Sequence, residues 1–74
     1  MNIATLEVIH KLLQLEVERT KEVAVSSRCR LRSYETDDPV PSLIEDQKAI
    51  VATHDKEASR AADALKDFET TDWN

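Results

Sequence analysis

The sequence predicts an all-α protein, a two-helix antiparallel hairpin of the coiled-coil type. Three observations predict it: the 74 residues contain no glycine, apolar residues recur at alternating steps of three and four, and both prolines lie together near the middle. Sandwiches, barrels and nucleotide-binding βαβ units depend on glycine at turns and phosphate loops, so the composition excludes them. At this length a single domain spans residues 1–74.

The first predicted helix runs from about residue 3 to about residue 34. Seven of the ten positions in its repeating series are apolar or aromatic. A mean spacing of about 3.5 residues is typical of two helices that pack along a seam. The series is Ile3, Leu6, His10, Leu13, Val17, Thr20, Ala24, Ser27, Leu31 and Tyr34.

A hinge over residues 35–42 separates this helix from a second one at about 43–69, which a short tail at 70–74 follows. Pro39 and Pro41 each push the preceding residue out of helical geometry. Ser42 and Glu45 have the spacing of a capping box, which predicts the start of the second helix. Its seam is Ile44, Gln47, Val51, His54, Ala58, Ala61, Leu65 and Phe68.

A short connection makes the two helices antiparallel neighbours. The predicted register sets Leu31 near Gln47 at the hinge and His10 against Phe68 at the open end. Because alanines gather in the second helix, we expect bulky residues of the first helix to pack against small residues of the second. These alanines are Ala58, Ala61, Ala62 and Ala64.

Further apolar residues lie beside the seam and predict an interface. A lone hairpin of this size buries too little surface to offset an ordering entropy of about 1.5 kcal/mol per residue. We therefore expect self-association into a homodimeric four-helix bundle, with a docking face for another protein as the alternative. The order of the oligomer, and whether the hairpin closes within one chain or is swapped between chains, stay open. The interface residues are Val8, Ile9, Leu12, Leu15, Leu43 and Ile50.

The sequence offers little for catalysis. A chain without glycine has no phosphate-binding loop. His10 and His54 fall on seam positions, and only His10 has a glutamate three residues before it, so the paired Glu-x-x-His sites of metal-binding bundles are incomplete. Cys29 falls on the outer face beside two arginines, with no histidine base close in sequence. We expect no catalytic residue, no metal ligand and no cofactor.

Arg28, Arg30 and Arg32 form a local basic cluster in an acidic chain of net charge −5. Small dimeric helical hairpins that bind RNA exist, and the predicted architecture is similar to the plasmid-encoded Rop type at the level of fold. The alternative function is therefore a dimeric nucleic-acid binder that uses these arginines. The competing interpretation is that they pair with acidic residues around the hinge, which are Glu35, Asp37, Asp38 and Glu45.

Trp73 lies one residue from the end of the sequence. It either folds back over Ile3 and Leu6 or anchors a partner, since tryptophan is enriched at binding hot spots.

These observations together predict a non-enzymatic protein–protein interaction module, a small helical adaptor, inhibitor or regulator. Its partners are itself and another protein, with nucleic acid less favoured. The start of the chain lacks the basic segment of a signal peptide, there is a single cysteine, and no apolar run is long enough to span a bilayer. We therefore expect a cytoplasmic protein with no membrane partner.

Overall fold

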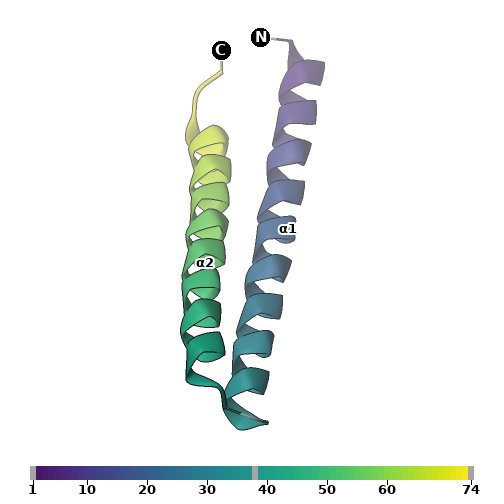
Figure 1. The fold of residues 1–74 in the computed structure, drawn as a ribbon. Coiled ribbons are helices and arrows are strands. Elements are labelled where there is room, and N and C mark those ends of the chain that lie inside the picture. Colours follow the sequence, from purple (N-terminus) through teal and green to yellow (C-terminus); the bar gives the residue numbers. More distant parts are fainter. Residues whose placement is uncertain (1, 38, 74) are drawn as a thin grey trace.

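The computed structural model describes residues 2–37 and 39–73, which form two helices. Helix α1 spans Ile3–Thr36 and helix α2 spans Pro41–Thr70. Figure 1 shows the helices side by side and antiparallel, so that the start of α1 and the end of α2 lie at the same end. The molecule is a rod of 55 × 14 × 12 Å. The prediction of an all-α two-helix hairpin is confirmed.

Helix α1 begins at a polar cap. The side-chain Oδ1 of Asn2 accepts a hydrogen bond from the backbone N–H of Ala4 at 2.8 Å, which satisfies one of the donors left free in the first turn. At its other end α1 continues two residues past the predicted end, to Thr36. A proline restricts only the residue directly before it, so Pro39 does not stop the helix as early as residue 34.

Helix α2 begins at Pro41, and the capping box predicted for Ser42 and Glu45 is wrong. Val40 is the N-cap residue, no side chain caps this end, and Ser42 lies inside the first turn. A proline suits the first helical position because its φ is already helical and its missing N–H would have had no partner there. The Glu45 Oε1 atom lies 3.5 Å from Nζ of Lys48 instead.

The hinge is consequently shorter than the predicted segment 35–42, since helical structure extends into it from both sides. Residue 38 of the hinge and residue 74 of the predicted tail lie outside the described residues. Helix α2 ends at Thr70, where the Thr71 hydroxyl donates to the carbonyl of Asp67 at 2.6 Å. The predicted boundary near residue 69 is therefore close to the observed one.

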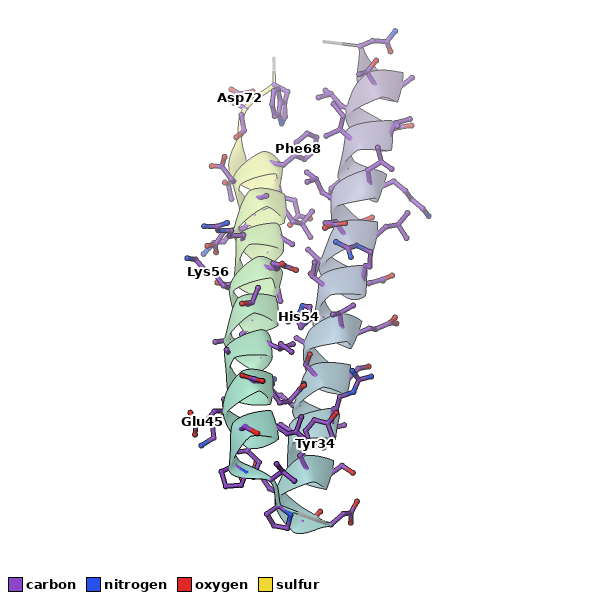
Figure 2. All side chains as sticks on the ribbon, viewed as in Figure 1. Tyr34, Glu45, His54, Lys56, Phe68 and Asp72 are labelled. Carbon is purple, nitrogen blue, oxygen red and sulfur yellow. The ribbon has the colours of Figure 1, made fainter. Side chains whose placement is uncertain are left out.

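Two contacts fix the register of the hairpin. At the open end the rings of His10 and Phe68 stack, with centroids 5.7 Å apart and planes 18° apart, as the predicted register requires. Near the hinge the Nε2 of Gln47 donates to the carbonyl of Ser27 at 3.0 Å. Figure 2 shows Phe68 and His54 directed from α2 toward α1, whereas Lys56 points away.

The interior of the hairpin is built from small and polar side chains. Thr20, Ala24 and Gln47 are each 4% exposed and Ser27 is 8% exposed, and no large side chain of the described residues is fully buried. Three of these four residues lie on α1, so in this part of the seam the small residues are on α1 and the longer Gln47 is on α2. The expectation that the small residues lie on the second helix is wrong here, although Ala58 and Ala61 are half-buried further along.

Replacing Gln47 by alanine tests the polar contact in the interior. We expect Gln47→Ala to lower the free energy of unfolding by about 1–2 kcal/mol, because a buried cross-helix hydrogen bond is lost. Urea unfolding followed by circular dichroism measures the change. Gln14 is exposed on α1, and Gln14→Ala is the matched control, with an expected change within about 0.5 kcal/mol. Equal effects of the two substitutions would contradict the role assigned to Gln47.

The helix starts make a second prediction. Asn2→Ala removes a side-chain cap and should cost about 0.5–2 kcal/mol, whereas Ser42→Ala should change stability little because Ser42 does not cap α2. Thermal unfolding of the two variants provides the comparison. A larger loss of stability for Ser42→Ala than for Asn2→Ala would show that Ser42 caps α2 after all.

Candidate interaction surface

Three large apolar side chains lie exposed in line on the outer side of α1. Val8 is 58% exposed, Leu12 59% and Leu15 49%. Residues spaced by four and three positions share one face of a helix. Their neighbours in the seam, Leu6 and Leu13, are only half-exposed or less because they meet α2. We call Val8, Leu12 and Leu15 the open-end patch.

A shallow groove of about 400 Å³ accompanies the open-end patch, lined by Ala4, Glu7, Val8, Lys11 and Leu12. Three of these side chains are apolar, and the remaining two, Glu7 and Lys11, carry opposite charges. Neither forms an ion pair within the part of the chain that the structure describes. The groove therefore combines uncovered apolar surface with one unneutralised anion and one unneutralised cation.

The remaining predicted interface residues lie elsewhere. Leu43 and Ile50 are 46% and 44% exposed on α2 near the hinge, and Ile9 is half-buried. Because Gln47 meets Ser27, Ile50 lies level with a point on α1 about nine residues beyond Leu15, which is about 14 Å along the rod. The six residues therefore form two separate apolar regions and not one continuous surface.

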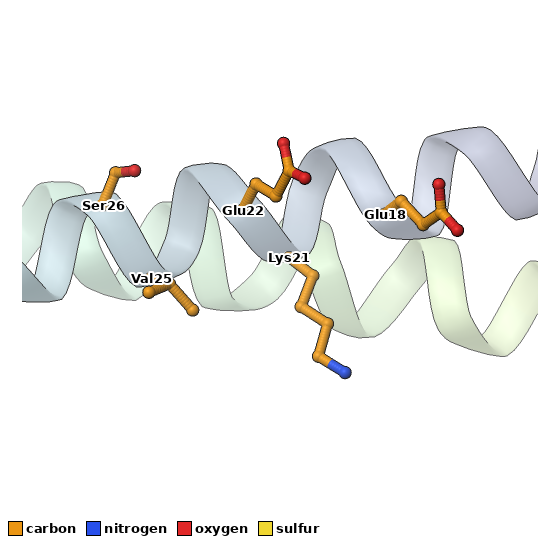
Figure 3. A pocket seen from close by; sticks show the side chains of 5 residues that line it. All are labelled: Glu18, Lys21, Glu22, Val25 and Ser26. Carbon is orange, nitrogen blue, oxygen red and sulfur yellow. The ribbon is translucent and has the colours of Figure 1, made fainter.

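A second open groove, of about 530 Å³, follows the same helix closer to the hinge. Figure 3 shows the side chains that line it, all of them from α1. Val25, 50% exposed, is its only large apolar side chain. Glu18, Lys21, Glu22 and Ser26 complete the lining. A single valine among charged groups presents far less apolar surface than the open-end patch.

Both histidines take part in the packing of the hairpin. His10 lies 3.0 Å from Glu69 through Nε2 and Oε2 and stacks on Phe68. The Nδ1 atom of His54 is buried without a hydrogen bond, 3.7 Å from Oε2 of Glu57. Among the described residues, no group of three or more His, Cys, Asp or Glu side chains is placed to hold a metal ion.

The basic cluster is only partly available for binding. Arg28 donates through Nη2 to Oδ1 of Asp55 on α2 at 2.6 Å. The interpretation that Arg28 pairs with acidic residues around the hinge is therefore wrong. Antiparallel packing of the helices brings Asp55 of α2 close to Arg28 instead. Arg30 and Arg32 are exposed and form no ion pair with any described residue, and Cys29 between them is also exposed.

Trp73 folds back, but onto its own helix. Its Nε1 donates to the carbonyl of Phe68 at 3.1 Å, and the two rings lie 5.1 Å apart. The last carbonyls of a helix lack partners within the helix, so an indole N–H close behind the helix end has an acceptor ready. The fold-back of Trp73 is thus onto Phe68, and Trp73 stays 41% exposed.

One ion pair on α1 changes the acidity of its carboxyl group. Arg19 donates from Nε to Oε2 of Glu16 at 3.0 Å. This hydrogen bond is the main cause that lowers the pKa of the Glu16 carboxyl, and the charge of Arg19 lowers it further. The sequence contains the signal for this contact, because side chains three residues apart are neighbours on a helix.

Comparisons with protein-family models, with curated proteins and with solved structures find no match for this chain. Neither helix, over its described residues, combines the length and the apolar character that crossing a membrane requires.

The Glu16–Arg19 contact predicts a pH-dependent contribution to stability. The folded pKa of Glu16 is lowered, so the contribution is present above the ordinary carboxyl pKa and is lost as the pH falls through the lowered value. We expect Arg19→Gln to return the Glu16 pKa toward its ordinary value, measured by carboxyl chemical shifts during an NMR titration. Arg60→Gln is the control, since Arg60 lines a groove between the helices together with Glu16 and Arg19 but forms no hydrogen bond to Glu16. An unchanged Glu16 pKa in Arg19→Gln would refute the assignment.

Proposed function

We propose that this protein is a non-enzymatic protein–protein interaction module that self-associates and binds through the outer apolar face of α1. It would act as a small helical adaptor, inhibitor or regulator. The observation that carries the proposal is the open-end patch, where Val8, Leu12 and Leu15 stand about half exposed on one helix face. Contiguous exposed apolar surface on a small protein marks an interaction site.

The contrast between the inside and the outside of the hairpin supports this proposal. The most deeply buried residues are Thr20, Ala24, Ser27 and Gln47, which supply little apolar surface. Folding two long helices costs about 1–2 kcal/mol of backbone entropy per ordered residue, so a hairpin with this seam gains stability from further burial. Covering the open-end patch with another helix provides it.

The form of self-association that we propose is a homodimer in which the helices of two hairpins lie side by side as a four-helix bundle. Helical hairpins bury an exposed apolar stripe in this way, and closed two-fold dimers are the commonest oligomers. The 3.5-residue spacing of the seam continues over both helices, which is typical of coiled-coil packing. The single exposed cysteine fits a reducing, cytoplasmic setting.

Nucleic-acid binding remains the alternative, and one observation favours it: Arg30 and Arg32 are exposed and carry no ion pair with described residues. Arg28 of the same cluster is already paired with Asp55 of α2. Two arginines on a chain of net charge −5 supply few phosphate contacts. We therefore propose protein, not nucleic acid, as the partner.

Charged substitutions in the open-end patch test the proposed function. We expect Leu12→Glu combined with Leu15→Glu to abolish assembly, because burying two carboxylates in an apolar contact is strongly unfavourable. Both side chains are exposed in the hairpin, so helicity should persist. Sedimentation equilibrium measures assembly, and circular dichroism measures helicity.

The matched control is Val25→Glu, which changes an equally exposed apolar side chain on the same helix outside the patch. It should assemble like the unaltered protein. If Leu12→Glu with Leu15→Glu leaves the mass in solution and the binding of partner proteins unchanged, the proposed function is wrong.

A further inference from the structure

We propose that the groove at the open end of α1 docks a second copy of this chain, with the two α1 helices antiparallel and the two-fold axis between residues 9 and 10. The inference rests on the proposed function and adds the partner, the orientation and the register. It is drawn from the charges on the rim of the groove and from the sizes of the side chains along it.

The rim charges select the orientation. Glu7 and Lys11 line the same groove, four residues apart, and neither has an ion-pair partner among the described residues. In antiparallel helices related by a two-fold axis, residues on the same flank of the contact meet each other. With the axis between residues 9 and 10, Glu7 of each copy lies within one residue of the level of Lys11 of the other, an offset of about 1.5 Å that these long side chains span to form two identical ion pairs. A parallel arrangement would instead set Glu7 against Glu7 and Lys11 against Lys11.

Side-chain size agrees with the same axis. Ala4 of one copy comes level with Leu15 of the other, and Val8 lies within one residue of the level of Leu12. The small Ala4 thus makes room for Leu15 at the ends of the contact, and Val8 and Leu12 meet near its centre. The exposed apolar surface of Val8, Leu12 and Leu15 is covered in both copies at once.

This contact joins the hairpins by their open ends. Helix α1 of each copy overlaps the other only over its first turns, so four helices lie side by side there and the hinges point in opposite directions. Three half-exposed apolar side chains per copy amount to less than the area of about 800 Å² per partner in a standard stable interface. The dimer should therefore be weak and should dissociate on dilution.

Charge reversal tests the register. Each of Glu7→Lys and Lys11→Glu places like charges across the axis and should weaken dimerisation about tenfold, measured by sedimentation equilibrium over a dilution series. The double variant Glu7→Lys with Lys11→Glu restores both ion pairs and should dimerise like the unaltered protein. An equimolar mixture of the two single variants should also associate, because each supplies the charges that the other needs. Circular dichroism confirms that all variants stay helical.

Cys29 provides an independent measure of the arrangement, since it is exposed and is the one cysteine of the chain. With spin labels on Cys29, the proposed dimer places the labels about 60 Å apart along the rod, by the rise of an α-helix. Two hairpins overlapping along their full length would place them at about 25 Å. Double electron–electron resonance separates these distances, and the shorter one would overturn the proposed register.

The remaining outcomes also decide the proposal. If both single charge reversals dimerise normally, or if neither the double variant nor the mixture restores association, the two-fold pairing of Glu7 with Lys11 is wrong. If the unaltered protein is a monomer at every concentration, yet a purified partner protein binds it and Leu12→Glu with Leu15→Glu abolishes that binding, the second copy and the proposed self-association are wrong, and only the binding of another protein through this face stands. If assembly persists in Leu12→Glu with Leu15→Glu, both proposals fail.

Discussion

The rest of this structure depends on the narrow, partly polar seam between the two helices. Thr20, Ala24 and Ser27 present short side chains toward α2, and Gln47 reaches across to the carbonyl of Ser27. A buried hydrogen bond between helices specifies one alignment, because any shift would leave a polar group without a partner. The seam therefore sets the register well, but it covers little apolar surface.

The open end is held by different chemistry. His10 stacks on Phe68, and Trp73 also contacts Phe68, both through its ring and through its indole N–H, which donates to the Phe68 carbonyl. Aromatic contacts supply burial where the seam contains no small residues to allow close approach. With one polar contact near the hinge and one aromatic cluster at the open end, the hairpin is aligned at both ends.

The histidines and Arg28 take part in contacts within the hairpin. The histidines contact Phe68, Glu69 and Glu57, and Arg28 holds Asp55, so these polar groups are occupied by contacts that join or support the helices. The groove of the open-end patch differs because Glu7 and Lys11 remain unpaired with any described residue beside Val8 and Leu12. Unpaired charges of both signs beside apolar surface favour a partner with a complementary pattern, and a two-fold related copy of the same groove has that pattern.

The sequence by itself determined the two helices, their antiparallel register and the exposure of Val8, Leu12 and Leu15. Each of these follows from periodicity, since apolar spacing and the position of Pro39 and Pro41 are local properties of the chain. The start of α2 at Pro41 was missed because the capping preference of Ser42 is weaker than the fit of a proline to the first helical position.

Only the tertiary structure decided which polar groups meet across the helices. Asp55 rather than a hinge carboxylate holds Arg28. Trp73 donates its indole N–H to the carbonyl of Phe68, and the predicted interface residues separate into two regions. Such choices depend on rotation of each helix about its axis and on side-chain reach. Sequence spacing constrains these quantities only loosely, whereas the packed seam fixes them for every residue at once.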